Sequence, residues 1–204
     1  MHLRLENIGK RYGLSWVFKD VNWEVQAGEK AAIIGHNGSG KSTLLKIISG
    51  GLIPTKGKIS YTNDSMQLTA DELTALLSFA APYIELIEEM TMLEHLMFHY
   101  SFLKPVPGIS IEDMVKNVGL KGHEDKLIRH FSSGMKQRLK LAMAIFSDTP
   151  LVLLDEPTAN LDEAGQTVYL ELADKFLENR TVIVSSNQPQ EYSFCTRVLD
   201  ITEY

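Results

Sequence analysis

Two stretches near the start of the chain, LRLENI and SWVFKDVNWEV, alternate apolar and polar residues. Alternation with a period of two is typical of half-buried strands, so we expect two strands with GKRYG as their hairpin connection. KAAIIG then predicts a short apolar strand that runs into a glycine-rich loop. STLLKIISG follows with helical spacing and a glycine stop. The pattern predicts a β-rich start followed by a strand–loop–helix unit.

The middle of the chain, from Ser65 to Lys104, is mostly helical in pattern and contains one strand-like piece, LLSFA. Thr69, with Glu72 three residues further on, has the residues of a capped helix start. TMLEHLMFHYSFL then predicts an amphipathic helix. This part of the chain therefore predicts a mainly helical lobe.

The last third of the chain returns to strands. A shorter helix is expected over residues 111–118, and another from Ser132 to about Phe146. Three apolar strands follow, LVLLD, TVIVSS and RVLDI. The helix AGQTVYLELADKFLEN separates the first two of them. This order favours an α/β core with an inserted helical lobe.

Composition narrows the possible functions. The 204 residues carry a formal net charge of -6, which makes the chain a poor general binder of nucleic acid. The single cysteine, Cys195, cannot form an internal disulfide and fits a reducing compartment. The most apolar long run, Ile84 to Leu103, is interrupted by glutamates and histidines, whereas a membrane span needs about 20 mostly apolar residues. The start lacks the apolar core of a signal peptide, so we expect another chain to hold this one at any membrane where it works.

The sharpest motif is GHNGSGKST, which satisfies G-x-x-x-x-G-K-[ST] between a predicted strand and a predicted helix. Glycines let backbone N–H groups close around phosphate oxygens, and the helix that begins near Lys41 adds positive character. Lys41 is expected to reach the β- and γ-phosphates of a nucleotide, and the Ser42 hydroxyl to bind Mg²⁺. The expected ATP-binding residues of this loop are Gly35, His36, Asn37, Gly38, Ser39, Gly40, Lys41, Ser42 and Thr43.

A second motif, LVLLDEP, places two carboxylates directly after a buried strand. In an enzyme with such a phosphate loop, Asp155 would hold Mg²⁺ through water, and Glu156 would polarise an attacking water as general base. An acidic turn at a strand end is common on its own. Its pairing with the phosphate loop favours an ATPase.

Between the two motifs lies FSSGMKQRLKLAMAI, and the three together resemble the nucleotide-binding subunit of an ABC transporter. The family signature, roughly L-S-G-G-[QM]-[KQ]-Q-R, stands here as residues 131–138, with Phe131 for leucine and Ser133 for glycine. The resemblance implies an α/β P-loop NTPase core with an N-terminal antiparallel β subdomain and an inserted α-helical subdomain. We expect one domain over residues 1–204, with the core and β subdomain in 1–81 and 131–204 and the helical subdomain in about 82–130.

The resemblance also implies a dimer. In the family the signature faces the γ-phosphate bound to the other subunit, so that two ATP molecules are sandwiched head to tail. The matching signature residues are Ser132, Ser133, Gly134 and Met135, and those of the D-loop, which touches the partner subunit, are Ala159, Asn160, Leu161 and Asp162. Tyr12 matches the aromatic residue that stacks on adenine, with Trp16 as its rival.

The helical insert is where family members dock the coupling helices of their transmembrane partners. Candidate groove residues in it are Met90, Met92, Leu93, Leu96, Met97, Phe98 and Phe102, although most of them could be core of that lobe. His95 and His99 stand one helical turn apart, a spacing that suits a metal, but no third ligand is in view.

Two positions depart from the family at the γ-phosphate. Pro82 stands where the family has a glutamine that contacts Mg²⁺, with Tyr83 next to it, and Asn187 stands where the family has a switch histidine. Asparagine can still donate a hydrogen bond, but it cannot become a cation. Losing one such stabilising group typically costs about 10²–10³ in rate. We therefore expect a slow ATPase, or one that is active only with its partner, with Glu156 and Asn187 as its catalytic residues.

The function implied by the resemblance is an ATP-hydrolysing subunit with Mg²⁺ as cofactor. Its expected partners are ATP, a second ABC subunit and a transmembrane permease, with no nucleic acid, at the inner face of the cytoplasmic membrane. Two alternatives stay open. The chain could be an ATP-binding module with little or no hydrolysis of its own, or a soluble ABC ATPase that acts outside transport.

Overall fold

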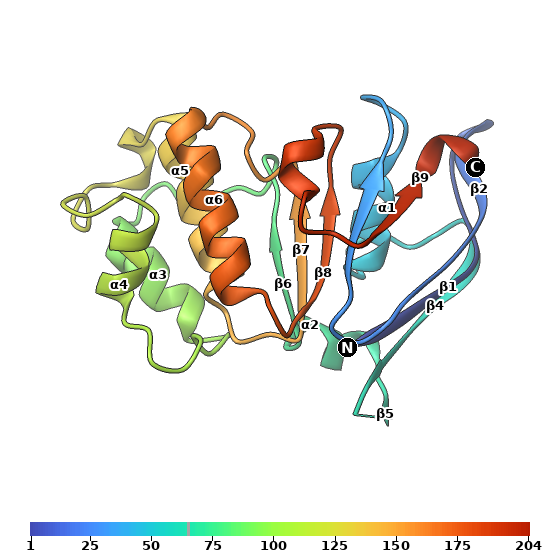
Figure 1. Ribbon diagram of the computed structural model, residues 1–204, viewed down its shortest axis with the longest axis horizontal. Coiled ribbons are helices and arrows are strands. Elements are labelled where there is room, and N and C mark those ends of the chain that lie inside the picture. Colours follow the sequence, from blue (N-terminus) through green and yellow to red (C-terminus); the bar gives the residue numbers. More distant parts are fainter. Residues whose placement is uncertain (65) are drawn as a thin grey trace.

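The computed structural model describes residues 1–64 and 66–204, which form two sheets and the helices packed on them (Figure 1). One sheet is antiparallel, with strand order β2–β1–β4–β5. Its strands are β1 (His2–Tyr12), β2 (Ser15–Val25), β4 (Lys56–Asn63) and β5 (Met66–Gln67). This sheet confirms the predicted β-rich start of the chain.

The connection between β1 and β2 is shorter than the sequence indicates. The expected connection GKRYG is wrong in its first four residues, because β1 continues to Tyr12 and pairs it with Ser15. Irregularities in the β1–β2 register let the strand continue, and the turn falls at Gly13, whose φ of 58° suits a tight hairpin.

The second sheet is parallel, with strand order β6–β7–β8–β3–β9. Its strands are β3 (Lys30–Ile34), β6 (Leu77–Ala80), β7 (Leu151–Asp155), β8 (Thr181–Ser185) and β9 (Arg197–Asp200). Every residue of β7 and β8 is buried, because elements cover both faces of a parallel sheet. The carboxyl ends of β3, β7 and β8 meet at one edge of this sheet, and the loops that leave that edge hold the candidate site.

Six α-helices surround the parallel sheet in the described part of the chain. They are α1 (Lys41–Ile48), α2 (Ala70–Thr74), α3 (Met92–Tyr100), α4 (Ile111–Asn117), α5 (Ser133–Ile145) and α6 (Glu163–Phe176). Short 3₁₀ turns cover Ile128–His130, Pro189–Tyr192 and Ile201–Glu203. Helices α3 to α6 gather at one end of the molecule and the antiparallel sheet lies at the other (Figure 1).

The helix starts follow local capping chemistry. The predicted capped start at Thr69 and Glu72 is confirmed, and α3 begins with the same reciprocal bonds between Thr91 and Glu94. The prediction of a mostly helical stretch from residue 65 to 104 is wrong at Met66–Gln67, which form β5, and for residues 82–90, which form an irregular segment before that cap. Ser65, at the start of the stretch, lies outside the described residues.

Helix α1 is buried between the two sheets. Its side chains Leu44, Leu45 and Ile48 pack in one apolar cluster with Leu5 of the antiparallel sheet and Ile33 of the parallel one. Burial on both sides fixes the position of α1, and with it the loop at its amino end. Among the helices of residues 1–64 and 66–204, we find none with the length and apolar character needed to cross a bilayer.

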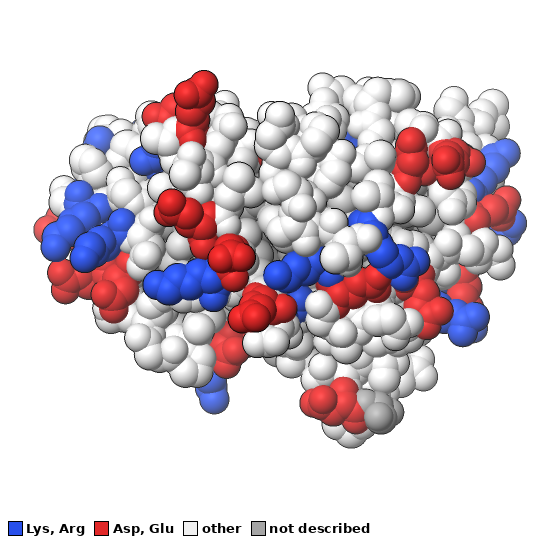
Figure 2. Space-filling model, viewed as in Figure 1, with Lys and Arg blue, Asp and Glu red and all other residues white. Residues whose placement is uncertain are grey.

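Charged side chains are interleaved on the surface. On the face shown in Figure 2, lysine and arginine side chains lie among aspartate and glutamate side chains. Exposed ion pairs of the chain include Lys56–Asp20 and Lys58–Glu6, and pairs of this kind add little stability.

Candidate nucleotide-binding site

The glycine-rich loop joins β3 to α1 at the carboxyl edge of the parallel sheet, and two of its glycines have no room for a side chain. A Cβ atom at Gly35 would lie 2.6 Å from Ser39 Oγ, and one at Gly40 would lie 2.6 Å from Val17 Cγ1. Both residues also have positive φ angles, 145° and 104°. Glycine is therefore required at both positions for the loop to close.

Lys41 is buried at the amino end of α1. Its ammonium donates hydrogen bonds to the carbonyl oxygens of Gly35, at 2.9 Å, and His36, at 3.2 Å. These bonds curl the loop around the lysine and hold its charge beside the first turn of the helix. Free N–H groups at a helix start and a fixed cation together favour an anion such as phosphate.

A recess of about 280 Å³ joins this loop to the second motif. It is lined by Val17, Asn37, Gly38, Gly40, Lys41, Ser42, Thr43 and Glu156. The structure thus brings Glu156 together with the loop, although more than a hundred residues separate them in the sequence. Sequence reasoning missed Val17, whose place on β2 could be found only from the packing of that strand against the loop.

Asp155 ends β7 and is buried. In residues 1–64 and 66–204, neither of its carboxylate oxygens has a hydrogen-bond partner. Buried carboxylates normally have one, so this carboxylate suits a cation or its water shell. Oxygen ligands are those that Mg²⁺ prefers, and the residues expected to bind it, Asp155 and Ser42, both supply oxygen. The chemistry of this pair fits Mg²⁺.

Glu156 follows in an unusual backbone conformation. Its φ is 43°, and its N–H donates a hydrogen bond of 2.8 Å to the Ser185 carbonyl at the end of β8. A side chain in this left-handed region costs about 1–3 kcal/mol, which the surrounding structure must offset. The bend directs Glu156 into the recess, and such strain is common at functional sites.

Buried groups hold the segment after Glu156. The Thr158 N–H donates to Glu191 Oε1 at 2.9 Å, and the Gln137 side-chain amide donates to the Pro157 carbonyl at 2.9 Å. The Tyr169 hydroxyl donates in turn to the Glu191 carbonyl at 2.8 Å. Sequence analysis missed Glu191, and its burial could have been suspected only from the fold.

Asn187 lies just after β8 and reaches the phosphate loop. Its side-chain Nδ2 donates a hydrogen bond to Asn37 Oδ1 at 3.1 Å. The residue at the switch position therefore contacts one of the loop residues that line the recess.

The signature and the D-loop meet in a second recess, of about 350 Å³, at the amino end of α5. Its lining residues are Ser132, Ser133, Gly134, Met135, Arg138, Asn160, Leu161 and Asp162. Ser132 caps α5 by accepting from the Met135 N–H at 3.2 Å. A Cβ atom at Gly134 would lie 3.0 Å from the Asn160 carbonyl, and Arg138 forms an ion pair of 3.0 Å with Asp162. Small residues and one ion pair thus join the two segments.

Tyr12 and Trp16 lie outside the lining of the phosphate recess. Tyr12 is 57% exposed, and the Lys10 ammonium lies 5.3 Å from the centre of its ring. The Trp16 ring is flanked by Arg11 and Lys19, at 5.4 and 5.0 Å. Stacking of either residue on adenine stays a prediction.

Tyr83 lies beside the Asp155 carboxylate. Burial, and then the charge of Asp155, raise the pKa of its hydroxyl. Pro82, the residue aligned with the family's glutamine, instead turns its carbonyl to the Lys140 ammonium, at 2.6 Å. The sequence analysis named Tyr83 only as part of a departure from the family, and it did not predict that Tyr83 lies near Asp155. The parallel pairing of Ala80 with Leu154, which the sequence does not give, explains that place.

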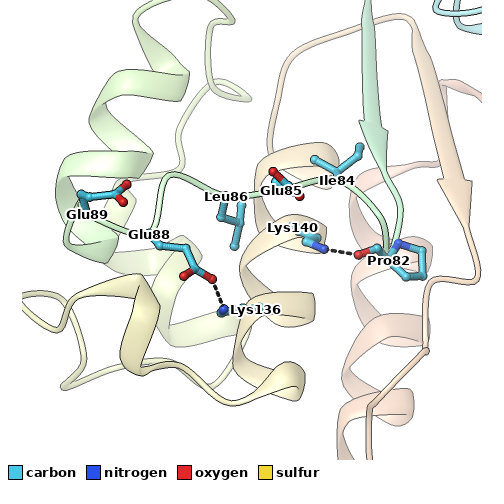
Figure 3. Close-up of a pocket in the computed structure, with 8 residues that line it drawn as sticks. All are labelled: Pro82, Ile84, Glu85, Leu86, Glu88, Glu89, Lys136 and Lys140. Carbon is cyan, nitrogen blue, oxygen red and sulfur yellow. Dashed lines mark hydrogen bonds and ion pairs between the residues drawn. The ribbon is translucent and has the colours of Figure 1, made fainter.

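A groove of about 560 Å³ lies beside Pro82 (Figure 3). It is lined by Pro82, Ile84, Glu85, Leu86, Glu88, Glu89, Lys136 and Lys140. Lys136 pairs with Glu88 across it, and Lys140 reaches from α5 to the Pro82 carbonyl. Burial, and then the charge of Lys136, lower the pKa of Lys140.

The two histidines of α3 are packed inside the helical region. His95 is buried, and His99 Nε2 lies 2.9 Å from Ser147 Oγ. Across the described part of the chain, no group of three or more His, Cys, Asp or Glu residues is placed to hold a metal ion.

Comparison with known proteins supports one family. The family model described as "ABC transporter" matches residues 18–159. The chain is 30% identical over 193 residues to the cytochrome c biogenesis ATP-binding export protein CcmA of Agrobacterium fabrum, covering 93% of this chain and 90% of that protein. It is 34% identical over 177 residues to ATP-binding cassette sub-family A member 7 of Rattus norvegicus, but covers only 8% of that protein's length.

A solved structure supports the same family. A dimeric post-hydrolysis state of an ATP-binding cassette, bound to ADP and Pi, matches with a TM-score of 0.80 and 28% identity, over 98% of this chain and 95% of that one. With the phosphate loop, the carboxylate pair and the signature in place, the chain belongs to the ABC transporter family, as one of its ATP-binding cassettes.

Proposed function

We propose that this chain is an ATP-hydrolysing subunit that dimerises head to tail on ATP and powers a separate permease at the inner face of the cytoplasmic membrane. The observation that carries the proposal is the single recess shared by the phosphate loop and Glu156. A loop that binds phosphates and a carboxylate that can accept a proton are the two parts that phosphoryl transfer to water requires.

Each part has a defined task. The loop N–H groups and Lys41 bind the phosphates, and Ser42 and Asp155 would hold Mg²⁺, which when bound neutralises phosphate charge. Glu156 polarises the attacking water and accepts its proton. Asn187 keeps one hydrogen-bond donor on the γ-phosphate side of the loop, where it is already fixed to Asn37.

The second recess supports the dimer. Ser132 and Gly134 stand at the start of α5, which has thirteen residues and therefore a helix N-terminus that can face an anion. In a head-to-tail dimer, this surface of one copy would face the phosphate loop of the second copy. The solved relative bound to ADP and Pi is dimeric, which supports the same arrangement here.

The helical region supports contact with a permease. Met92 and Leu96 are buried core, whereas Met97, Phe98 and Phe102 are exposed, so a minority of the candidate residues are free for a partner. The groove beside Pro82 adds a second surface, which offers acidic side chains. The cytochrome c biogenesis relative is named as an export protein, which favours an exporter-type partner.

A second candidate is an ATP-binding module with weak hydrolysis of its own. The observation that favours it is Asn187, which cannot supply the positive charge of a histidine. In that case a complete partner subunit would provide the faster composite site.

The first test is steady-state Mg²⁺-ATP hydrolysis by the purified chain, with Glu156→Gln as control. Turnover that vanishes in the control supports the ATPase. ATP binding and ATP-dependent dimerisation without turnover support the second candidate. Absence of ATP binding would overturn both.

A further inference from the structure

Helix α5 carries the signature at its start and a buried lysine in its second half. Ser132 caps the helix, and Lys140 lies eight residues later, about 12 Å along the helix axis. Only 8% of Lys140 is exposed, and the residue lines the groove beside Pro82. A contact that fixes Lys140 therefore also fixes the helix on which the signature stands.

The Lys140 ammonium holds the segment that follows β6. It donates hydrogen bonds to the carbonyl oxygens of Ala81, at 3.2 Å, and Pro82, at 2.6 Å (Figure 3). Proline has no N–H group, so the main chain of Pro82 can bind a neighbouring side chain only through its carbonyl oxygen. The two bonds join α5 to the end of β6, the strand that pairs with β7.

Packing alone does not explain a lysine at this position. Both acceptors are neutral, and burial of an ammonium among neutral groups costs free energy that an apolar side chain would not. Lys136, one turn earlier on the same face of α5, pairs with Glu88 of the same segment (Figure 3). Two cations of α5 are thus directed at residues 81–88, which favours a specific link between the helix and this segment.

The two ends of α5 are attached to different parts of the core. Near its start, the helix meets the D-loop in the second recess, and the Gln137 side-chain amide donates to the Pro157 carbonyl at 2.9 Å. These contacts attach α5 to the segment after β7, whereas Lys140 attaches it to the segment after β6. Because a helix that is attached only near one end can still tilt, the contact of Lys140 sets the direction in which the signature points.

We propose that Lys140 is a positioning residue of the composite ATP site: its bonds to the segment after β6 hold the signature where it meets the nucleotide of a second copy. The inference rests on the proposed function, because it takes the head-to-tail dimer as given. Lys140 touches no nucleotide in this arrangement. Its effect reaches the nucleotide of the second copy through α5, and nucleotide binding by its own phosphate loop is left unchanged.

The first test measures dimerisation on ATP by sedimentation velocity. All chains carry Glu156→Gln, so that ATP stays unhydrolysed. Lys140→Met and the shorter Lys140→Ala should weaken dimerisation by about tenfold or more, the usual effect of losing a hydrogen bond to a charged group. Lys140→Arg keeps a cationic donor on α5 and should dimerise much as the parent does. Lys116→Met, at an exposed position of α4, is the control and should change nothing.

ATP binding by the monomers is measured at protein concentrations below dimerisation. The Kd for ATP should be the same in Lys140→Met, Lys140→Ala and the parent, which also shows that the variants are folded. A structural defect spread through the chain would weaken this binding too.

A mixing experiment shows which ATP site Lys140 serves. Lys41→Ala impairs the phosphate loop but leaves the signature of its own chain intact. A mixed dimer of Lys140→Met and Lys41→Ala therefore has one site in which an intact loop meets an intact signature. The mixture should dimerise on ATP at a lower protein concentration than either variant alone.

Four results would overturn the inference. Parent-like dimerisation by folded Lys140→Met or Lys140→Ala would remove the role of the ammonium. Equal losses in Lys140→Met and Lys140→Arg would assign the effect to packing of the side chain. Weaker ATP binding by the Lys140→Met monomer, or a mixture no better than its components, would place the effect outside the signature. In each of these cases the proposed function stands, whereas a parent that binds ATP without dimerising would overturn the proposed dimer as well.

Discussion

The side-chain amide of Asn187 donates a hydrogen bond to Asn37 Oδ1 at 3.1 Å, which joins the segment after β8 to the phosphate loop. In the proposed function, the same donor would turn to the γ-phosphate of bound ATP. Its strength is limited, because a neutral amide stabilises developing negative charge less than a cation does.

Substitutions of Asn187 should therefore lower or raise kcat, depending on the side chain that replaces it. Asn187→Ala should lower kcat by about 10², the effect of removing one donor to developing charge. Asn187→His should raise kcat above that of the parent chain. Phosphate release at saturating Mg²⁺-ATP measures both, and an alanine variant with the parent's kcat would contradict this role.

Gly40 should tolerate no side chain. Gly40→Ala places a Cβ atom 2.6 Å from Val17 Cγ1 at a φ of 104°, so we expect ATP binding to be lost. The free energy of unfolding should fall by about 1–3 kcal/mol from backbone strain alone. Titration calorimetry and urea unfolding measure the two effects.

Gly108→Ala is the control for that variant. Its φ is 81°, but a Cβ atom there meets open space, so it carries backbone strain without a clash. It should lose some stability and bind ATP as the parent does. Equal ATP binding by Gly40→Ala and Gly108→Ala would show that the close approach of Val17 does not shape the loop.

Glu191 should act on the rate through Thr158. Glu191→Ala leaves the buried Thr158 N–H without its acceptor, which should lower the free energy of unfolding by about 1–3 kcal/mol. Because this bond holds the segment after Glu156, kcat should fall while the Kd for ATP stays constant. Glu171→Ala, on the exposed side of α6, should change neither quantity. An unchanged kcat in a folded Glu191→Ala would contradict the positioning role.

Stability should fall in mild acid because of two histidines. Burial lowers the pKa of His95 and of His99 in the folded chain, so the unfolded chain takes up protons first as the pH falls. The free energy of unfolding should therefore be constant above a pH of about 6.5 and decrease below it, through the folded pKa values. Urea unfolding between pH 7.5 and 5, on the order of six points, measures the slope.

The double variant His95→Gln, His99→Gln should flatten that slope. His130→Gln, at an exposed position, should leave it as it is. A double variant with the parent's full slope would mean that other groups carry the acid sensitivity.

The sequence predicted the parts of this molecule that are encoded locally. The loop from Gly35 to Thr43 has its own strand, glycines and helix, and Asp155 follows an unmistakable buried strand, so both could be placed without knowing the fold. Tyr83 and Glu191 could not, because their partners are set by strand register and by packing between distant segments. The end of β1 at Tyr12 was misjudged for the same kind of reason, since irregular pairing with β2 carries the strand past its expected turn.

Gly134 packs so closely on the D-loop that a Cβ atom there would lie 3.0 Å from the Asn160 carbonyl, and this has a mechanical consequence. The signature and the D-loop are packed together, and the Ala159 N–H donates a hydrogen bond of 3.0 Å to the Glu156 carbonyl. In the proposed head-to-tail dimer, these packed segments of each copy would face the nucleotide bound to the other copy. A shift of Glu156 in one copy would then displace the surface that faces the nucleotide of the other copy, so the two sites would be mechanically coupled.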